Sequence, residues 1–339
     1  MAKKCAIILA AGEGTRMKLN SPKVLASVLF KPMLKWVLDS VVLSEIDNIC
    51  IVAGYRHQDV KNYLDSIDIN SDLVIQNERK GTAHAVMCAE KFLNQYSDED
   101  VLILGGDSPF IDEITIKKSY DIHKSNLNAA TVISAEIDEP SGYGRILRDK
   151  TNKFIDIIEH KDATESVKMI KEVNSGAYWF NIKKLLSVLP NISNNNAQGE
   201  YYLPDTIKLL LERGEKVYAF KTNCKDIVLG ANTCEQLNDL NVIAKNKIIR
   251  EMLKKGVNIP CADGIIIGPD VEIKEGSCIM PNTLIYGLSS IGPNCIIGPN
   301  SEIIDTVLEE GSSVKFSYCK NSVIKKCQSI GPFCSIIND

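Results

Sequence analysis

The sequence of 339 residues lacks three features, and each absence disfavours a class of protein. No uninterrupted apolar run approaches the roughly 18 residues that a membrane-spanning helix needs, so we expect no membrane partner. Lys and Arg total 39 against 43 for Asp and Glu, a net charge of −4, so no basic excess favours nucleic acid as a partner. The 11 cysteines and four histidines form no CxxC pair and no Cys/His cluster, which disfavours a zinc site.

The N-terminus also lacks a convincing secretory signal. Its apolar run ends at Ala11 and a polar glycine turn follows at once, whereas a signal needs a longer apolar region. The expected compartment is therefore the cytoplasm, where the cysteines would stay as reduced thiols that pack as small apolar groups.

Short apolar runs alternate with amphipathic stretches over the first two thirds of the chain. The runs predicted as buried strands are residues 5–10, 49–53, 73–76, 101–104 and 130–135, and helical patterns lie at 32–43, 58–64, 83–92 and 114–124. Such alternation is typical of a mostly parallel sheet covered by helices on both faces. We therefore predict an α/β domain of the doubly wound, Rossmann-like kind over residues 1–228.

A repeat of six residues governs the C-terminal part of the chain. Isoleucine recurs at 267, 273, 279, 285, 291, 297 and 303, then the phase breaks between 308 and 322 and resumes at Ile324. A fixed period of six is typical of a parallel β-helix whose stacked coils bury a continuous core, and an ordinary β-sandwich does not require it. We predict a connecting helix within residues 229–260 and a β-helix of hexapeptide repeats over 261–339.

A glycine-rich loop directly follows the first predicted strand, at Gly12-Glu13-Gly14-Thr15-Arg16-Met17. Backbone N–H groups of such a loop can approach phosphate oxygens. The dinucleotide fingerprint GxGxxG fails because Met17 stands at its third glycine, and the Gly-Lys-Ser/Thr end of a Walker A loop is missing. What remains is a glycine turn with Arg16 inside it and Lys23 after it, and two cations beside backbone donors suit a triphosphate.

These features together resemble the bifunctional bacterial UDP-N-acetylglucosamine pyrophosphorylase/glucosamine-1-phosphate acetyltransferase family. The resemblance covers the glycine loop, the Pro22-Lys23 pair, the hexapeptide tail and seven further segments in the family's order. These segments are Gln76 with Gly81-Thr82-Ala83-His84-Ala85, Gly106-Asp107, Gly142-Tyr143-Gly144-Arg145, residues 159–163, Asn174-Ser175-Gly176, residues 198–205 and Gly230-Ala231-Asn232. The resemblance implies Rossmann-like and left-handed β-helix domains. It also implies uridylyl transfer from UTP to N-acetylglucosamine 1-phosphate, giving the peptidoglycan precursor UDP-N-acetylglucosamine and pyrophosphate.

The resemblance also implies roles for particular residues. Arg16 and Lys23 would be catalytic, and Asp107 and Asn232 would hold Mg²⁺ through the hard oxygen ligands that it prefers. The sugar would be bound by Gly144, Glu159 and Asn174. The nucleotide would lie against Leu9, Ala10, Ala11, Gly12, Gly14, Gln76, Gly81, Thr82 and Gly106. From the residues alone, Asp107 could simply cap a turn and Asn232 could cap the helix that follows.

Two departures from the family pattern affect these expectations. Gly105 stands before Gly106-Asp107 where the family usually carries a larger residue, which bears on nucleotide affinity and base choice. The chain also stops before the family's acetyl-CoA site, so we expect no acetyl transfer, and the resemblance implies a homotrimer packed through the β-helices. Two alternatives stay open. One is a nucleotidyltransferase for another sugar 1-phosphate, such as glucose 1-phosphate, and the other is a nucleotide-sugar-binding regulatory or scaffold protein.

Overall fold

The computed structural model describes residues 4–196 and 198–338 of the chain, with the backbone alone at Thr15. Contacts divide the chain into two compact units. The first runs up to Ala26 and then from Pro32 to Cys234, and the second holds Ser27–Lys31 and resumes at Glu235. The sequence pattern predicts the end of the first domain at residue 228, and it does not predict that a short segment near the N-terminus belongs to the second unit.

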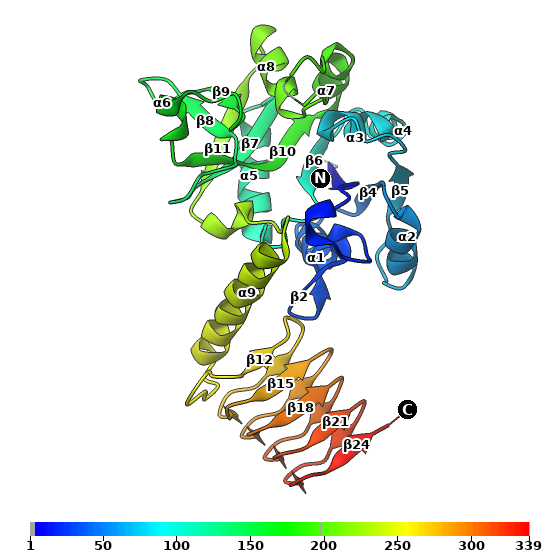
Figure 1. The fold of residues 1–339 in the computed structure, drawn as a ribbon, viewed down its shortest axis with the longest axis vertical. Helices are drawn as coiled ribbons and strands as arrows, with labels where there is room; N and C mark the ends of the chain where they lie inside the picture. The colour runs from blue at the N-terminus through cyan, green and yellow to red at the C-terminus, as the bar shows by residue number, and fades with distance from the viewer. Residues whose placement is uncertain (1–3, 197, 339) are drawn as a thin grey trace. The chain divides into compact units, whose positions relative to one another are not determined.

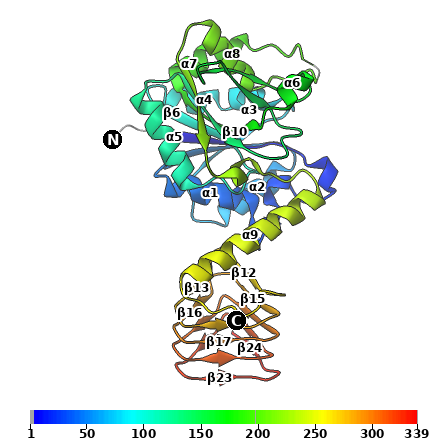
Figure 2. The ribbon, with the colours of Figure 1, turned by 90° about the vertical axis from the view of Figure 1, so that its left-hand side faces the viewer.

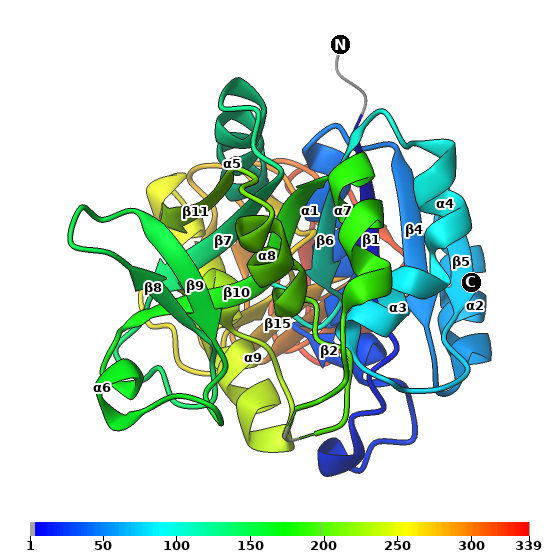
Figure 3. The ribbon, with the colours of Figure 1, turned by 90° about the horizontal axis from the view of Figure 1, so that it is seen from above.

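A nine-stranded sheet forms the centre of the first unit, with strand order β11-β7-β10-β6-β1-β4-β5 (Figure 3). Off this path, β8 pairs with β10 and β9 pairs with β8. Its strands are β1 (Lys4–Ala10), β4 (Asn48–Ala53), β5 (Asp72–Ile75), β6 (Asp100–Gly105), β7 (Ala130–Glu136), β8 (Arg145–Arg148), β9 (Phe154–Ile158), β10 (Glu172–Asn181) and β11 (Val217–Thr222). The β1–β4, β1–β6, β4–β5 and β7–β11 pairs are parallel, whereas β10 is antiparallel to β6 and β7. The predicted α/β class is confirmed, and the antiparallel β10 is a feature that the sequence pattern did not predict.

Helices cover both faces of this sheet (Figures 1 and 2). One apolar cluster includes side chains of α1 (Met33–Leu43), α2 (His57–Asp65) and α5 (Glu113–Ser125). The other includes side chains of α3 (Thr82–Cys88), α4 (Glu90–Gln95), α7 (Ile182–Val188) and α8 (Pro204–Glu212). β1 lies between both clusters, which explains its continuous apolar run. The single helix predicted over 83–92 is two helices, because the backbone leaves helical geometry at Ala89.

Short elements complete the first unit and lead into the second. α6 (Glu165–Lys168) and four 3₁₀ turns, Thr15–Met17, Lys23–Leu25, Leu189–Asn191 and Lys225–Val228, lie in connections of the first unit. β2 (Ser27–Val28) and β3 (Lys31–Pro32) form a small hairpin, and α9 (Cys234–Lys254) precedes the hexapeptide repeats. None of the helices in the described part of the chain combines the length and the apolar character needed to cross a membrane.

The repeats fold into a parallel β-helix, as the period of six predicts, and its left hand is the one that the family resemblance implies. Its three sheets have the orders β12-β15-β18-β21-β24, β13-β16-β19-β22 and β14-β17-β20-β23. The strands are β12 (Ile266–Ile267), β13 (Glu272–Ile273), β14 (Cys278–Ile279), β15 (Thr283–Tyr286), β16 (Ser290–Ile291), β17 (Ile296–Ile297), β18 (Ser301–Ile304), β19 (Val307–Leu308), β20 (Ser313–Val314), β21 (Tyr318–Lys320), β22 (Val323–Ile324), β23 (Ser329–Ile330) and β24 (Ser335–Ile337).

The isoleucines of the six-residue repeat occupy the inward-facing positions of the β-helix. The seven isoleucines from 267 to 303 are at most 5% exposed. Across the break in the repeat, Leu308, Val314 and Cys319 take the inward place in register with the isoleucines of the preceding coil. The core is therefore continuous although the sequence period is not.

Candidate active site

The glycine loop leaves the carboxyl end of β1, which lies between the two parallel neighbours β4 and β6. Carboxyl ends of such strands are where open α/β sheets bind ligands. Gly14 has a φ of +66°, and a Cβ there would lie 2.7 Å from the Cβ of Lys23, so this position needs glycine both for its conformation and for its contact with Lys23. Met17 is buried and closes the loop by donating its N–H to the carbonyl of Gly14 at 2.9 Å.

A cavity of about 630 Å³ opens beside this loop. Its lining comes from the glycine loop, from the segment before α3 and from the end of β6. The predicted nucleotide residues among the lining are Leu9, Ala11, Gly12, Gln76, Gly81 and Thr82, and Lys23 and Asp107 join them. Ala10 is buried beneath the loop, and Gly106 donates its N–H to the carbonyl of Leu9 at 2.9 Å. Arg16 is exposed and is not among the lining residues.

Gln76 is the buried amide of this cavity, with 5% of its surface exposed. Its Nε2 donates to the carbonyl of Gly81 at 3.1 Å and lies 2.9 Å from Nδ1 of His84. These contacts fix the direction of the amide, so His84 has a structural role as the partner that orients Gln76. Both N–H donors of the amide are thereby used, and its Oε1 is left to accept a hydrogen bond, which suits an N–H at the edge of a pyrimidine base.

A second cavity of about 380 Å³ adjoins the first, since Leu9, Thr82 and Gly176 line both. Its polar lining includes the predicted sugar residues Glu159 and Asn174. The amide of Asn174 is held on both sides: its Nδ2 donates to the hydroxyl of Tyr178 at 2.6 Å, and its Oδ1 accepts from the N–H of Gly176 at 3.0 Å. Burial raises the pKa of Glu159, and the nearby carboxylates of Asp162 and Asp205 raise it further.

Gly144 is not among the residues that line this cavity, but it contacts two that are. Its carbonyl accepts from the N–H of Asn174 at 2.9 Å, and a Cβ at this position would lie 3.0 Å from Oε1 of Glu159. The three residues predicted for the sugar are therefore neighbours in the structure. Two tyrosines of the lining, Tyr178 and Tyr202, were not predicted. Tyr202 lies in the matched segment 198–205, so its place in that segment was the available signal.

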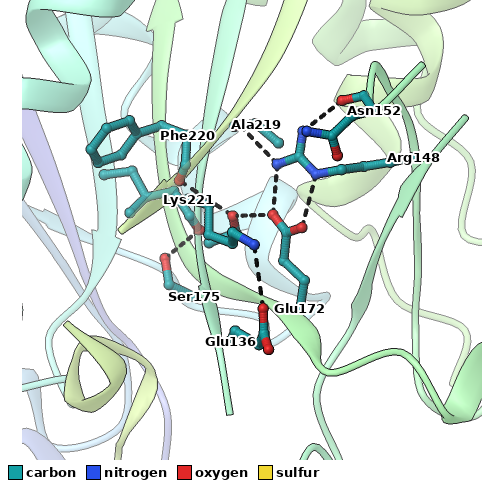
Figure 4. A network of polar contacts seen from close by, with 10 residues as sticks. Glu136, Arg148, Asn152, Glu172, Ser175, Ala219, Phe220 and Lys221 are labelled. Atoms are coloured by element: carbon teal, nitrogen blue, oxygen red, sulfur yellow. Dashed lines mark hydrogen bonds and ion pairs between the residues drawn. The ribbon is translucent and has the colours of Figure 1, made fainter. Parts of the chain in front are cut away.

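A buried ion pair fixes the strand that carries Asn174 (Figure 4). Arg148 on β8 donates through Nε and Nη2 to both carboxylate oxygens of Glu172 on β10, at 2.8 and 2.6 Å. Ser134 of β7 donates to the same carboxylate at 2.7 Å, and Arg148 also donates to the carbonyl of Ala219 on β11 at 3.0 Å. Burial alone would raise the pKa of Glu172, but the hydrogen bonds from Arg148 and Ser134 outweigh it and lower that pKa. The network joins four strands two residues before Asn174.

The ammonium group of Lys23 contacts the side-chain oxygens of the two residues predicted to hold the metal. This group forms an ion pair with Asp107 and donates to Oδ1 of Asn232 at 2.6 Å. The Lys23 side chain is 8% exposed and that of Asp107 is 31% exposed. A carboxylate oxygen and an amide oxygen thus converge on one cation, and the same hard donors fit Mg²⁺, which commonly takes few protein ligands. Lys23 was predicted at the phosphates, and its contact with these two oxygens was not foreseen.

Glycines allow the two metal-site residues to come this close. A Cβ on Gly230 would lie 2.9 Å from the carbonyl oxygen of Asp107, and a Cβ on Gly105 would lie 2.7 Å from its Oδ1. Gly105, which departs from the family pattern, therefore makes room for the Asp107 carboxylate in this position. Over residues 4–196 and 198–338, no group of three or more His, Cys, Asp and Glu side chains is arranged to hold a metal. The Asp107 and Asn232 side chains would offer a metal two oxygen ligands.

A further ion pair links two sides of the first cavity. Arg79, from the segment before α3, pairs with Glu13 of the glycine loop, and both side chains line the cavity. Sequence reasoning singled out neither residue. The pair is partly exposed, with 55% of the Arg79 side chain and 24% of the Glu13 side chain accessible, so it contributes little to stability.

Comparison with known proteins assigns the chain to a family. A family model described as nucleotidyl transferase matches residues 5–227. The chain belongs to the nucleotidyl transferase family. It is 40% identical to the bifunctional protein GlmU of Thermoanaerobacter pseudethanolicus over 97% of this chain and 71% of the relative. Its identity to GlmU of Clostridium novyi is 40%, over 98% of this chain and 72% of the relative. For GlmU of Shouchella clausii the identity is 39%, over 99% of this chain and 73% of the relative.

The fold of the nucleotidyl transferase is also found among solved structures. A Bacillus anthracis protein described as a glucose-1-phosphate thymidylyltransferase, in complex with a sucrose, aligns with a TM-score of 0.60 and 23% identity. The alignment covers 71% of this chain and 95% of that one. At this identity the likeness shows the fold alone.

The family match and the GlmU relatives show that the chain is a nucleotidyltransferase. This enzyme class acts on a nucleoside triphosphate and a sugar phosphate with the help of a divalent metal.

Proposed function

We propose that this nucleotidyltransferase joins UTP and N-acetylglucosamine 1-phosphate into UDP-N-acetylglucosamine and pyrophosphate, with Mg²⁺ as the metal. The pair of adjoining cavities carries this proposal. The first offers the glycine loop and a buried, oriented amide. The second offers the carboxylate of Glu159 and the oriented amide of Asn174. Two ligands placed in these cavities would meet at the residues that line both.

The reaction needs alignment and charge neutralisation rather than a general base. An oxygen of the sugar phosphate, already anionic at neutral pH, forms a bond to the α-phosphorus of UTP. The bond from that phosphorus to the bridging oxygen of the β-phosphate breaks, and pyrophosphate leaves with the electron pair. Positioning of the two phosphates and stabilisation of their charge therefore supply most of the catalysis.

The first cavity would hold the nucleotide. The oriented amide of Gln76 would read the uracil edge, next to Gly81 and Thr82. The backbone of residues 9–14 would face the phosphates, with donors that need no side-chain movement. Arg16, exposed on the loop, would fold over the departing pyrophosphate.

The second cavity would hold the sugar phosphate. Glu159 in its ionised form would accept hydrogen bonds from sugar hydroxyls, and Asn174 would bind through its amide. The backbone of Gly144 would face the acetamido group. Support for this arrangement comes from Gly144, whose carbonyl accepts from the N–H of Asn174 and which leaves room beside it for the carboxylate of Glu159.

Asp107 and Asn232 would hold the metal through their side-chain oxygens. A divalent cation held there would supply positive charge to neutralise the phosphates at the reacting centre. Lys23 would have to leave the two oxygens at that moment, and its long side chain would carry the ammonium group toward the phosphates. Lys23 would thus contact Asp107 and Asn232 before the substrates bind and the phosphates afterwards. We further infer that three copies associate through their β-helices, which sedimentation velocity would show as a trimer.

Pyrophosphate release tests the proposal. With UTP and Mg²⁺, the rates with N-acetylglucosamine 1-phosphate, glucosamine 1-phosphate and glucose 1-phosphate should differ, and the first substrate should give the highest kcat/KM. Removal of the metal with EDTA should abolish release, and added Mg²⁺ should restore it. A preference for glucose 1-phosphate would keep the reaction class and reject the sugar. Tight binding of nucleotide sugar without turnover of any of the three would reject the enzyme in favour of a binding protein.

A further inference from the structure

The turn of the β2–β3 hairpin has a backbone conformation that its two residues, Leu29 and Phe30, normally avoid. Leu29 and Phe30 form the two-residue loop, with φ values of +46° and +67°. Two-residue hairpin loops of this kind need positive φ at both positions and are usually Asn-Gly or Gly-Gly. A Leu and a Phe in this conformation are strained, and such strain persists only where the surroundings impose the conformation.

Three contacts impose it, and all of them lie within the second unit. The ring of Phe30 stacks on Tyr286 of β15, with centroids 4.0 Å apart and planes 13° from parallel. The N–H of Leu29 donates to Oδ1 of Asn241 on α9 at 2.9 Å. Nζ of Lys31 lies 2.5 Å from Oδ1 of Asp270. The segment Ser27–Lys31 accordingly groups with the second unit and not with the residues on either side of it.

The groups that receive the hairpin are themselves fixed. The hydroxyl of Tyr286 donates to Glu302 of the next coil at 2.7 Å, which sets the plane of the ring. Nδ2 of Asn241 donates to the carbonyl of Leu237 one turn earlier on α9 at 2.8 Å, which sets the direction of its oxygen. The β-helix and α9 thus present a preformed seat.

The hairpin continues directly into the turn that carries Lys23. Ala26, at its base, donates its N–H to the carbonyl of Lys23 at 3.0 Å, and its own carbonyl accepts from the N–H of Met33 at 3.0 Å. Movement of the hairpin would therefore pass through these two hydrogen bonds to the turn Lys23–Leu25. Lys23 is the residue whose ammonium group lies on Asp107 and Asn232.

We propose that the β-helix unit acts as a positioning element for catalysis, because its seat of Tyr286, Asp270 and Asn241 holds the strained hairpin and thereby the turn that carries Lys23. The inference rests on the proposed function for the catalytic role of Lys23. The anchoring of the turn does not depend on it. Tyr286, Asp270, Phe30 and Lys31 are positioning residues in this account, and none of them touches substrate.

Hydrogen exchange of the full chain, followed by mass spectrometry, tests the anchoring. Tyr286→Leu removes the ring, whereas the matched control Tyr286→Phe keeps the ring and loses only the hydroxyl. Amides of residues 23–26 should exchange about tenfold faster in Tyr286→Leu. The change should be much smaller in Tyr286→Phe, because the stacked ring remains and only its hydrogen bond to Glu302 is lost. Phe333→Ala removes another exposed aromatic ring of the β-helix and should leave these amides unchanged. Unchanged exchange in Tyr286→Leu would overturn the inference.

Kinetics of the same variants test the positioning role. Tyr286→Leu should lower kcat about three- to tenfold while KM for both substrates stays within about twofold, because misplacement of a catalytic group mainly affects the transition state. Lys31→Asp should have a similar effect, and the exchanged pair Lys31→Asp with Asp270→Lys should recover most of kcat. Asp270 is exposed, whereas the Lys31 side chain is only 11% exposed. Because the exchanged pair restores both charges, the test stands even if Tyr286→Leu does not fold.

The outcomes separate the two proposals. Faster exchange with an unchanged kcat would overturn the positioning role. If the wild-type chain released no pyrophosphate with any sugar phosphate, the proposed function would fail, and the exchange rates would still decide whether the β-helix anchors the turn.

Discussion

Removal of the Lys23 ammonium group should let the free protein bind a divalent metal in the absence of nucleotide. In the structure this group is hydrogen-bonded to the carboxylate of Asp107 and to the amide oxygen of Asn232, which are the oxygens proposed for the metal. A metal can take both oxygens only if Lys23 gives up both bonds. Hydrogen bonds of charged groups contribute roughly 1.5–3 kcal/mol each, and the partial exposure of Asp107 reduces that value. We take about 2–2.7 kcal/mol for the pair, which corresponds to roughly 30- to 100-fold in affinity.

Mn²⁺ titration followed by electron paramagnetic resonance measures this affinity directly. Without nucleotide, Lys23→Met should bind Mn²⁺ roughly 30- to 100-fold more tightly than the wild-type chain. Lys18→Met removes the same charge from an exposed position five residues earlier and serves as the control. With UTP present, the difference should shrink, since the phosphates offer Lys23 another partner. Turnover of Lys23→Met should fall at the same time, so affinity and activity should change in opposite directions.

Equal Mn²⁺ affinity in wild type and Lys23→Met would refute this reasoning. Such a result would mean that Lys23 gives up the two oxygens at no cost, and that its observed position has no bearing on metal entry. A gain of the same size in Lys18→Met would also refute it, because the effect would then follow from net charge.

Three further predictions concern the loops and strands around the cavities. The pKa of Glu159 is raised, so its ionised, sugar-binding form is lost at a higher pH than for an ordinary glutamate. KM for the sugar phosphate should therefore rise as the pH falls through that range. Glu159→Gln should remove this dependence on pH. Since burial disfavours its charge, Glu159 destabilises the fold above its folded pKa, and Glu159→Gln should raise the melting temperature at pH 7. Gly14→Ala should cost about 1–2 kcal/mol in unfolding free energy and lower kcat, because its Cβ would collide with Lys23. Arg148→Ala leaves the buried carboxylate of Glu172 without its cation, and urea unfolding should show a loss of about 3–5 kcal/mol.

The sequence predicted best where local pattern and packing agree. Each isoleucine of the six-residue repeat points into the β-helix because a coil has one inward place per face, so the repeat marks the core directly. The glycine loop, Gln76 and Asp107 also lie together, because the carboxyl ends of parallel strands meet at one edge of the sheet.

The features that the sequence did not predict depend on contacts between distant segments. β10 is antiparallel in a sheet of otherwise parallel pairs along its main path, and an apolar run carries no information about strand direction. The ammonium group of Lys23 reaches Asn232, 209 positions later, and no spacing rule connects them. The grouping of Ser27–Lys31 with the second unit rests on Phe30 and Tyr286, two aromatic residues that the hexapeptide pattern does not single out.

Turnover by Asp107→Ala is the decisive measurement, since this carboxylate is the proposed metal ligand at the junction of the two substrates. We predict that pyrophosphate release from UTP and N-acetylglucosamine 1-phosphate falls by roughly 100-fold or more in this variant, while UDP-N-acetylglucosamine still binds. The control variant Asp98→Ala, which removes an exposed carboxylate elsewhere, should keep full activity. Release within about threefold of wild type in Asp107→Ala would contradict the account, because the chemistry would then proceed without the site that the structure assembles around Lys23, Asp107 and Asn232.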